Sequence, residues 1–208
     1  MNMNIVQQYI DFLYENLPRE EIEKIFSIPP GVTVLRNDGI YNIFEHPHVK
    51  LWHRFLIERF RPEKRRYCLL LPCTSIKPYR LSATHRVAEA RLEALGISTE
   101  TSVYVVSEPM ALVPRELDVY YPFANYEYPP EELTYVYRRK LVKIISQVLK
   151  KIVEAHRRIV AVLPRHHLSI VMEAASIANT IDKMEFVPYG RLAFRSIAIA
   201  IDKLVDRT

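Results

Sequence analysis

The stretch Tyr67-Cys68-Leu69-Leu70-Leu71-Pro72 decides the fold class of this chain. An unbroken apolar run of this length, ended by a proline, is typical of a strand that is buried on both faces of a parallel sheet. A polar loop follows, and residues 84–95 then show the pattern of a helix closed by Gly96, because glycine commonly ends helices. A strand, a loop and a helix in this order indicate the start of a βαβ unit.

The same alternation continues outward from this unit. Further strands are predicted at residues 32–34, 103–106, 159–163 and 185–188. Further helices are predicted at residues 4–16, 19–26, 47–60, 131–156, 168–179 and 192–205. A turn is expected at residues 37–39, and residues 108–132, rich in proline and tyrosine, are expected to form a long ordered loop. The sequence therefore predicts an α/β fold: a three-layer sandwich with a mostly parallel central sheet at residues 63–208, preceded by a helical N-terminal segment at residues 1–62.

Length and composition exclude several classes of protein. The chain has 208 residues, of which 49% are hydrophobic, so it can bury a core without a disulfide or a structural metal. Its two cysteines, Cys68 and Cys73, form no disulfide framework and no CxxC metal motif, which favours a reducing compartment. No Gly-rich phosphate loop, signal peptide or membrane span is recognisable. We therefore expect a cytoplasmic protein with no metal and no cofactor.

Positive charge is concentrated in one predicted helix. The chain has a net charge of +5, and residues 138–158 hold eight Lys or Arg and one acid, so the rest of the chain is slightly negative. A localised basic face favours a polyanionic partner, although a solvated helix face explains the same pattern equally well. The candidate RNA contacts are Arg138, Arg139, Lys140, Lys143 and Lys150, with Arg165 and His166 after the strand at 159–163.

Three segments follow the carboxyl ends of predicted strands, where open α/β sheets bind ligands. The first, residues 72–85, is the densest in polar side chains. Cys73 can serve as a nucleophile if a cation such as Lys77 or His85 lowers its pKa, but a small buried apolar residue is the more common role of a free cysteine. Ser82 and Thr84 can simply cap the next helix.

The other two segments are less specific. Residues 107–128 gather tyrosines, acids and amides, a composition that suits a pocket for a flat hydrogen-bonding ring and also suits ordinary packing of a Pro-rich loop. Residues 164–169 place Arg165, His166 and His167 at a strand end. Adjacent histidines point in different directions, so these two alone are not expected to form a metal site, and one of them is a candidate contact to a phosphate or a base edge.

The first segment resembles a known signature. Residues 72–85 read PCTSIKPYRLSATH and are similar to the PCSxxKPYxxSxSH motif of the archaeosine synthase catalytic-domain family, a paralogue of archaeal tRNA-guanine transglycosylase. Thr74 and Thr84 replace serines of the motif and keep the hydroxyl group. His46-Pro47 with Trp52 resembles the HPxxxxW lead-in of the family, and residues 113–126 resemble its VPRELxxxYPxxxY segment. The resemblance spans about half of the chain and identifies it as a short stand-alone form.

This resemblance implies a function and a fold. The family adds the side-chain amine of free lysine to the nitrile of 7-cyano-7-deazaguanine in tRNA, and a radical S-adenosylmethionine partner then releases archaeosine. The resemblance also implies a likeness to the uracil-DNA glycosylase fold. The alternatives are a non-catalytic RNA-binding subunit that completes a separate transglycosylase or archaeosine synthase chain, and a glycosylase-like hydrolase.

The motif also assigns candidate roles. The catalytic candidates are Cys73, Lys77 and His85: the cysteine either adds to the nitrile or lines the pocket, and the other two move protons. Glu116, Asp118 or Glu127 are candidates for holding the ammonium group of the incoming lysine. The candidates for substrate binding are Thr74, Ser75, Tyr79, Ser82, Arg115, Glu116, Asp118 and Asn125.

Overall fold

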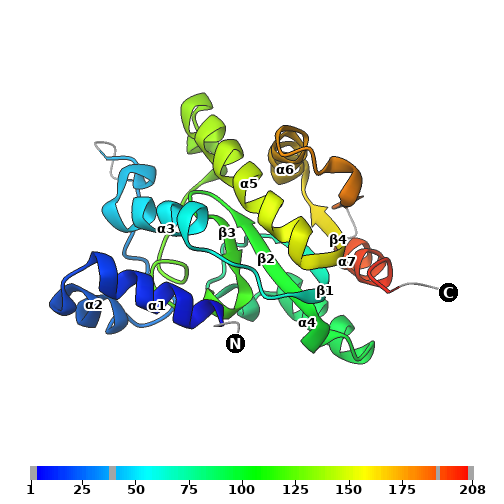
Figure 1. The fold of residues 1–208 in the computed structure, drawn as a ribbon, viewed down its shortest axis with the longest axis horizontal. Coiled ribbons are helices and arrows are strands. Elements are labelled where there is room, and N and C mark those ends of the chain that lie inside the picture. The colour runs from blue at the N-terminus through cyan, green and yellow to red at the C-terminus, as the bar shows by residue number, and fades with distance from the viewer. Residues whose placement is uncertain (1–3, 38–40, 191–192, 206–208) are drawn as a thin grey trace.

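A five-stranded sheet forms the centre of the molecule in this computed structural model, which describes residues 4–37, 41–190 and 193–205 (Figure 1). Its strands lie in the order β3-β2-β1-β4-β5. Their bounds are β1 Arg65–Pro72, β2 Thr101–Ser107, β3 Ala111–Pro114, β4 His156–Leu163 and β5 Glu185–Pro188. β3 runs antiparallel to β2, and the other pairs are parallel. The predicted α/β class with a mostly parallel sheet is therefore confirmed.

The apolar run that begins at Tyr67 lies in β1, at the middle of the sheet. Leu69 pairs with Val103 of β2 on one side and with Val160 of β4 on the other. Because side chains alternate along a strand, Cys68 and Leu70 join the larger apolar core, whereas Leu69 and Leu71 join a second core on the opposite face. A strand covered on both faces must be apolar throughout, and this explains the unbroken run.

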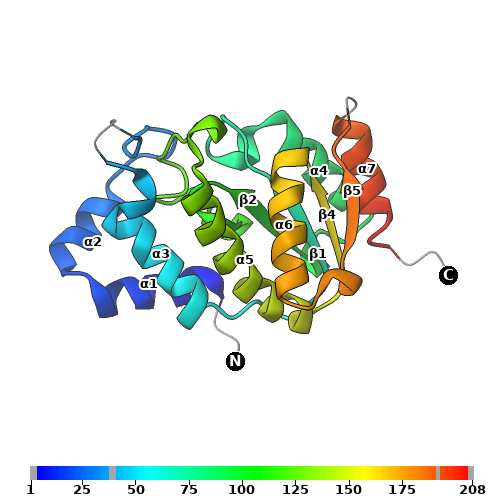
Figure 2. The ribbon, with the colours of Figure 1, turned by 90° about the horizontal axis from the view of Figure 1, so that it is seen from above.

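Helices cover both faces of the sheet. Helices α4 (Ala83–Ala94) and α7 (Ala193–Asp202) pack together on one face, and α5 (Tyr135–Ala155) and α6 (Arg165–Ile177) pack together on the other. Figure 2 shows α5 and α6 in front of the strands with α4 behind them. The chain passes from β1 to β2 through α4 and from β4 to β5 through α6, in opposite directions along the sheet. The topological switch point, where such sheets bind ligands, therefore lies between β1 and β4.

Three helices precede the sheet and extend its larger core. They are α1 (Ile5–Asn16), α2 (Arg19–Phe26) and α3 (Pro47–Glu58). The ring of Trp52 lies 5.2 Å from that of Tyr9 and 4.6 Å from that of Phe123, centre to centre, so these helices are joined to the β-sheet part by aromatic contacts. No helix of the described residues combines the length and the apolar character needed to cross a bilayer.

Two predicted elements differ from the structure. Residues 32–34 form no strand: the N–H groups of Val34 and Leu35 both donate to the carbonyl of Asn125, and only Leu35 makes an isolated bridge, to Tyr126. The predicted long loop at residues 108–132 contains β3, which a three-residue turn after β2 folds back as an edge strand. Prolines around this short strand concealed it. The turn expected at residues 37–39 lies partly outside the described residues.

Candidate functional site

Three neighbouring parallel strands end at the switch point, and a reactive side chain follows each of them. Cys73 follows β1, Glu108 follows β2, and His166 and His167 stand in the first turn of α6 after β4. Nε2 of His167 lies 2.9 Å from Oε2 of Glu108 and 3.9 Å from Sγ of Cys73. Nε2 of His166 lies 2.8 Å from the other carboxylate oxygen, Oε1. We call these four residues the Cys–Glu–His cluster.

Burial and charge perturb the cluster strongly. Burial alone would raise the pKa of the Glu108 carboxyl, but hydrogen bonds from His166 and His167 lower this pKa to about 2. For His167, burial opposes the charged form, yet Cys73 and Glu108 together raise its pKa to about 10. Glu108 and His167 are only 3% and 5% exposed, whereas Cys73 is half-buried and His166 is exposed. Strongly shifted groups that border the surface at a switch point mark a candidate functional site.

Helix α3 positions Glu108. The indole Nε1 of Trp52 donates to the carbonyl of Met110 at 2.7 Å, and Nε2 of His53 donates to the carbonyl of Pro109 at 2.7 Å. These two bonds hold the turn that directly follows Glu108. Burial lowers the pKa of His53 to about 4, only partly offset by its hydrogen bond, so the ring is neutral at physiological pH. The tryptophan of the sequence motif is therefore a positioning residue for the cluster.

Lys77 and a group of hydroxyls lie next to the cluster. The ammonium of Lys77 is 4.2 Å from the ring centre of Tyr126 and donates to the carbonyl of Thr74 at 3.3 Å. Burial lowers the pKa of Lys77, against the opposing effects of Cys73 and Glu127. The hydroxyls of Tyr79, Tyr126 and Ser107 hydrogen-bond to one another in the interior, where burial raises the pKa of both tyrosines. Lys77 is thus a half-buried amine whose pKa lies below its ordinary value.

Several other residues of the first segment hold the loop in shape. The hydroxyl of Thr74 donates to the carbonyl of Ile76, and Ser82 caps α4. Nε2 of His85 donates to the carbonyl of Pro72 at 3.0 Å, and its ring stacks on Tyr79. Ser75 is exposed. The catalytic and substrate-binding roles of these residues stay predictions.

The candidate residues of the second segment also make hydrogen bonds or ion pairs with other parts of the chain. Asp118 is buried and accepts hydrogen bonds from the backbone and the guanidinium of Arg80. Arg115 pairs with Glu89, and Glu116 lies 3.4 Å from Arg65. The amide of Asn125 donates to the carbonyls of Pro29 and Val32 at 2.8 Å each. The roles of these four candidates in binding substrate stay predictions.

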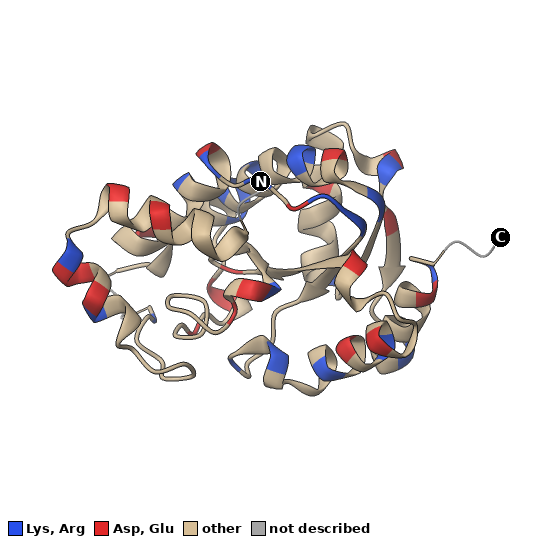
Figure 3. Cartoon of the chain, turned by 60° about the horizontal axis from the view of Figure 1, so that its bottom comes forward, with Lys and Arg blue, Asp and Glu red and all other residues tan. Residues whose placement is uncertain are grey.

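A cavity of about 940 Å³ lies beneath α4, on the face of the sheet opposite the larger core. The second half of the first segment contributes Arg80, Leu81 and His85 to its lining, whereas Cys73 packs against the larger core. Both signs of charge line this cavity, and Figure 3 shows Lys or Arg and Asp or Glu side by side along α4. The cavity is therefore distinct from the Cys–Glu–His cluster, and it offers no uniformly positive surface.

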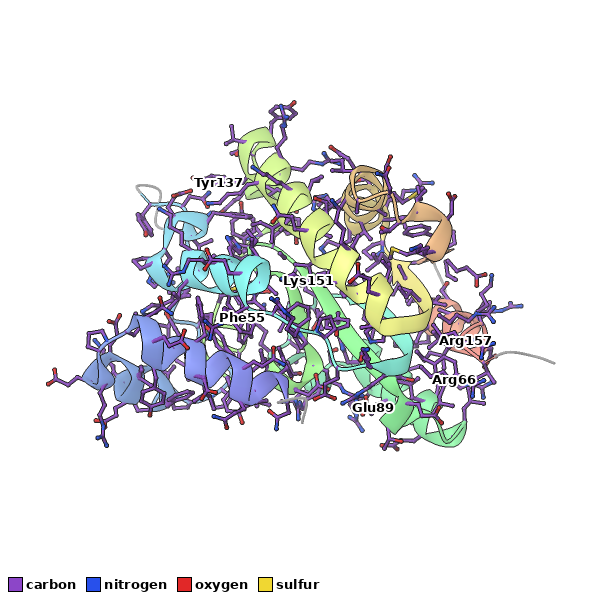
Figure 4. All side chains as sticks on the ribbon, in the orientation of Figure 1. Phe55, Arg66, Glu89, Tyr137, Lys151 and Arg157 are labelled. Carbon is purple, nitrogen blue, oxygen red and sulfur yellow. The ribbon has the colours of Figure 1, made fainter. Side chains whose placement is uncertain are left out.

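Internal contacts engage part of the basic helix α5. Arg138 pairs with Glu173 at 2.6 Å, and Lys140 lies 3.3 Å from Glu45. Lys151 donates to the carbonyls of Leu56, Ile57 and Phe60 where α3 ends, and Figure 4 shows it between α5 and α3. The candidate RNA contacts that are exposed on α5 and α6 are Arg139, Lys143, Lys150, Arg165 and His166. Their binding of RNA stays a prediction.

Glu108 is the cluster residue that the sequence did not single out, and His167 was named only as a candidate phosphate or base-edge contact, not as a partner of Cys73. Each lies in a segment that follows a predicted strand, and this position was the available signal. The pairing between them depends on β2 and β4 flanking β1, and no local pattern in the sequence shows that arrangement.

Comparison with known proteins adds the family. A model described as a domain of unknown function, DUF5591, matches residues 49–188, a range that includes the whole cluster. The chain is thus an α/β domain that belongs to the DUF5591 family.

The relatives of this chain carry a more specific name. It is 28% identical over 162 residues to archaeosine synthase subunit alpha of Thermococcus kodakarensis, which covers 74% of this chain and 27% of that protein. It is 36% identical over 75 residues to the subunit alpha of Methanosarcina acetivorans, covering 36% of this chain and 12% of the relative. The chain therefore spans about a quarter or less of the length of these curated relatives.

A solved structure supports the fold. The crystal structure of AF0587, a protein of unknown function, aligns with a TM-score of 0.50 and 17% sequence identity, covering 76% of this chain and 50% of that one. At this identity the likeness concerns the fold alone.

Proposed function

We propose that this chain acts in the archaeosine modification of tRNA and adds the side-chain amine of lysine to the nitrile of 7-cyano-7-deazaguanine. The observation that carries the proposal is the place of the motif cysteine: Cys73 stands at the switch point beside a buried His–Glu pair. Relatives named archaeosine synthase subunit alpha support the same role, one of them with similarity over 74% of this chain. The likeness to uracil-DNA glycosylase stays a prediction.

The reaction needs an activated nitrile and a neutral amine. In the addition, the amine nitrogen bonds to the nitrile carbon and the triple bond becomes a double bond. One proton leaves the amine and the nitrile nitrogen gains one, so the product is an amidine and no other reactant is consumed. Lys77 is the candidate for the proton exchange, because it lies beside the cluster and burial lowers its pKa from the ordinary value. The Cys–Glu–His cluster activates the nitrile, in one of the two ways described next.

Two routes fit this site. In the first, the Cys73 thiolate adds to the nitrile carbon, a thioimidate forms, and the amine displaces the sulfur. In the second, the amine adds directly to a nitrile that the cluster polarises. The flat base must leave the stack to reach either group, and this favours a target in a loop of the tRNA.

The exposed basic residues of α5 and α6 are the proposed contacts to the tRNA backbone. We also propose that a partner chain takes part, because the matched relatives are named as subunits and are much longer than this chain. A radical S-adenosylmethionine enzyme that releases archaeosine from the lysine adduct is the partner class that this chemistry requires.

Mass spectrometry tests the proposal directly. The purified chain is incubated with tRNA carrying the cyano base and with isotope-labelled lysine, and digested nucleosides are analysed. We expect a nucleoside heavier than the precursor by one whole lysine, because addition expels nothing. If tRNA binds and no adduct forms, with or without a long relative added, the chain is not the transferase. If the adduct forms only with the relative present, the non-catalytic RNA-binding subunit is the correct reading.

Tests in cells separate the neighbouring steps. Deletion of the gene should remove archaeosine and accumulate the cyano precursor. Accumulation of unmodified guanine at that position would instead place the chain in the transglycosylase step, and the proposal would be wrong.

A further inference from the structure

We infer that Cys73, Glu108 and His167 bind one zinc ion, whose open coordination position faces the entrance of the site. The three side chains offer a thiolate sulfur, a carboxylate oxygen and an imidazole nitrogen, and these ligand atoms all lie within 4.8 Å of one another. The role of the ion rests on the proposed function: it polarises the nitrile nitrogen. The existence of the metal site does not rest on that function.

The direction of the side chains distinguishes a metal site from a catalytic relay. In a Cys–His–acid relay, one imidazole nitrogen faces the sulfur and the other holds the acid. Here both Sγ of Cys73 and Oε2 of Glu108 lie near the same atom, Nε2 of His167. Among the described residues, Nδ1 of His167 has no hydrogen-bond partner. Three ligand atoms that converge on one point suit a shared ion better than a proton relay.

The types of ligand select the metal. Sulfur together with imidazole and one carboxylate is a set that zinc accepts, whereas magnesium and calcium prefer oxygen ligands alone. Zinc bonds of ~2.0–2.3 Å place neighbouring ligand atoms about 3.3–3.6 Å apart in a tetrahedron, so small side-chain shifts bring these three to the required separation. Three protein ligands with a free fourth position are the arrangement of catalytic zinc.

The surroundings support the same assignment. Nε2 of His166 binds Oε1 of Glu108, which leaves Oε2 free to ligate and fixes the orientation of the carboxylate. Trp52 and His53 hold the turn after Glu108, so the ligands stand on rigid elements. Because Cys73 is half-buried and His166 is exposed, the cluster borders the surface, and the inferred fourth position lies on that side. A metal there would withdraw electrons from the nitrile, the amine would add to its carbon, and the proton that the amine loses would pass through Lys77 to the nitrile nitrogen.

Metal binding is measured first, without tRNA. The full chain is stripped with a chelator, loaded with Zn²⁺ or Co²⁺, and the bound metal is counted. We expect one ion per chain and, with Co²⁺, a sulfur-to-cobalt charge-transfer band beside tetrahedral ligand-field bands. Failure of the folded wild-type chain to retain either metal would overturn the inference, and it would leave the proposed function standing.

Variants assign the ligands. Cys73→Ala and His167→Gln should each lower zinc affinity by more than about 100-fold, and His166→Ala by about 10–100-fold through the ligating carboxylate. Cys68→Ala is the matched control, since its sulfur is buried in the strand, and it should retain the wild-type cobalt spectrum. Thermal melts confirm that each variant is folded. Unchanged affinity in folded Cys73→Ala would exclude the site.

Cys73→Asp separates a ligand from a nucleophile. An aspartate still ligates zinc but cannot form a thioimidate. We expect this variant to bind Co²⁺ without the charge-transfer band and to retain lysine transfer at a reduced rate that depends on added zinc. A metal-loaded Cys73→Asp chain without any transfer, beside an active wild type, would assign covalent chemistry to Cys73 and overturn the catalytic role of the ion.

Discussion

At the scale of single residues, several residues of the 72–85 motif shape the loop that carries Cys73. Ser82, His85 and Tyr79 shape the loop through a cap, a carbonyl contact and a buried hydroxyl. Cys73 lies against the buried His–Glu pair, with its Sγ 3.9 Å from Nε2 of His167. A change at Cys73 should therefore affect chemistry more than stability.

Replacement of each cysteine in turn tests this. Cys73→Ser and Cys73→Ala should abolish lysine transfer and leave the melting temperature nearly unchanged, because Cys73 is half-buried. Cys68→Ser is the matched comparison: Cys68 is fully buried, and an unpaired hydroxyl there should cost ~1–3 kcal/mol of unfolding free energy. Lysine-transfer assays beside thermal melts measure both effects. Near-normal turnover in either Cys73 variant would rule out the thioimidate.

At the scale of elements, α3 matters through its carbonyl contacts to the turn after β2. His53 makes one of them and is buried with a pKa of about 4, below its ordinary value of 6.5. The unfolded chain therefore binds a proton at His53 before the folded chain does. Stability that depends on His53 is complete above pH 6.5 and decreases as the pH falls toward 4.

Chemical denaturation across this pH range checks the expectation. Relative to His53→Gln, whose amide can still donate to Pro109, the wild type should lose up to about 3 kcal/mol of unfolding free energy between pH 6.5 and 4. Groups common to both chains cancel in the difference. A difference that does not vary with pH would show that His53 accepts its proton in the folded state.

Helix α5 carries the prediction on RNA. Lys143 and Lys150 are exposed, whereas Lys140 and Arg138 reach acidic side chains of neighbouring elements. Lys143→Ala with Lys150→Ala should weaken tRNA binding and reduce the salt slope by up to ~0.9 per lost duplex-phosphate contact. Lys183→Ala, an exposed lysine on another element, is the control. Binding titrations at several salt concentrations measure this slope. An unchanged slope would show that the basic face of α5 is solvated and does not contact tRNA.

At the scale of the whole molecule, the helices before the sheet are part of its core. Trp52 and Phe55 are fully buried, and the Trp52 ring contacts Phe123 of the β-sheet part. The division at residues 62 and 63 is a prediction from sequence that a truncation can test. A chain of residues 63–208 should lack a cooperative thermal transition, since it exposes the apolar surface that α1 and α3 cover. A cooperative melt of that fragment would show two independent units.

Sequence patterns predicted the parts of this molecule that depend on local chemistry. The apolar run of β1 indicated a central strand, and the periodicity of α1 and α5 indicated helices. Burial of one face or of both faces of an element requires apolar residues at regular positions in the sequence. The strand β3 was missed because the prolines around it are atypical of strands and conceal its short apolar pattern. Cys73 was found through its motif, whereas its partners Glu108 and His167 lie 35 and 94 residues away and meet it only through the order of the strands.

One lysine of α5 deserves separate treatment in any scan of that helix. Lys151 offers its ammonium to three carbonyls where α3 ends, and burial lowers its pKa to about 8. We expect an alanine at this position to remove these hydrogen bonds between α5 and the end of α3 and to lower the stability of the chain. A loss of tRNA affinity in that variant would therefore not by itself identify Lys151 as an RNA contact. The positive charge in the sequence thus overstates the charge that α5 presents to a nucleic acid.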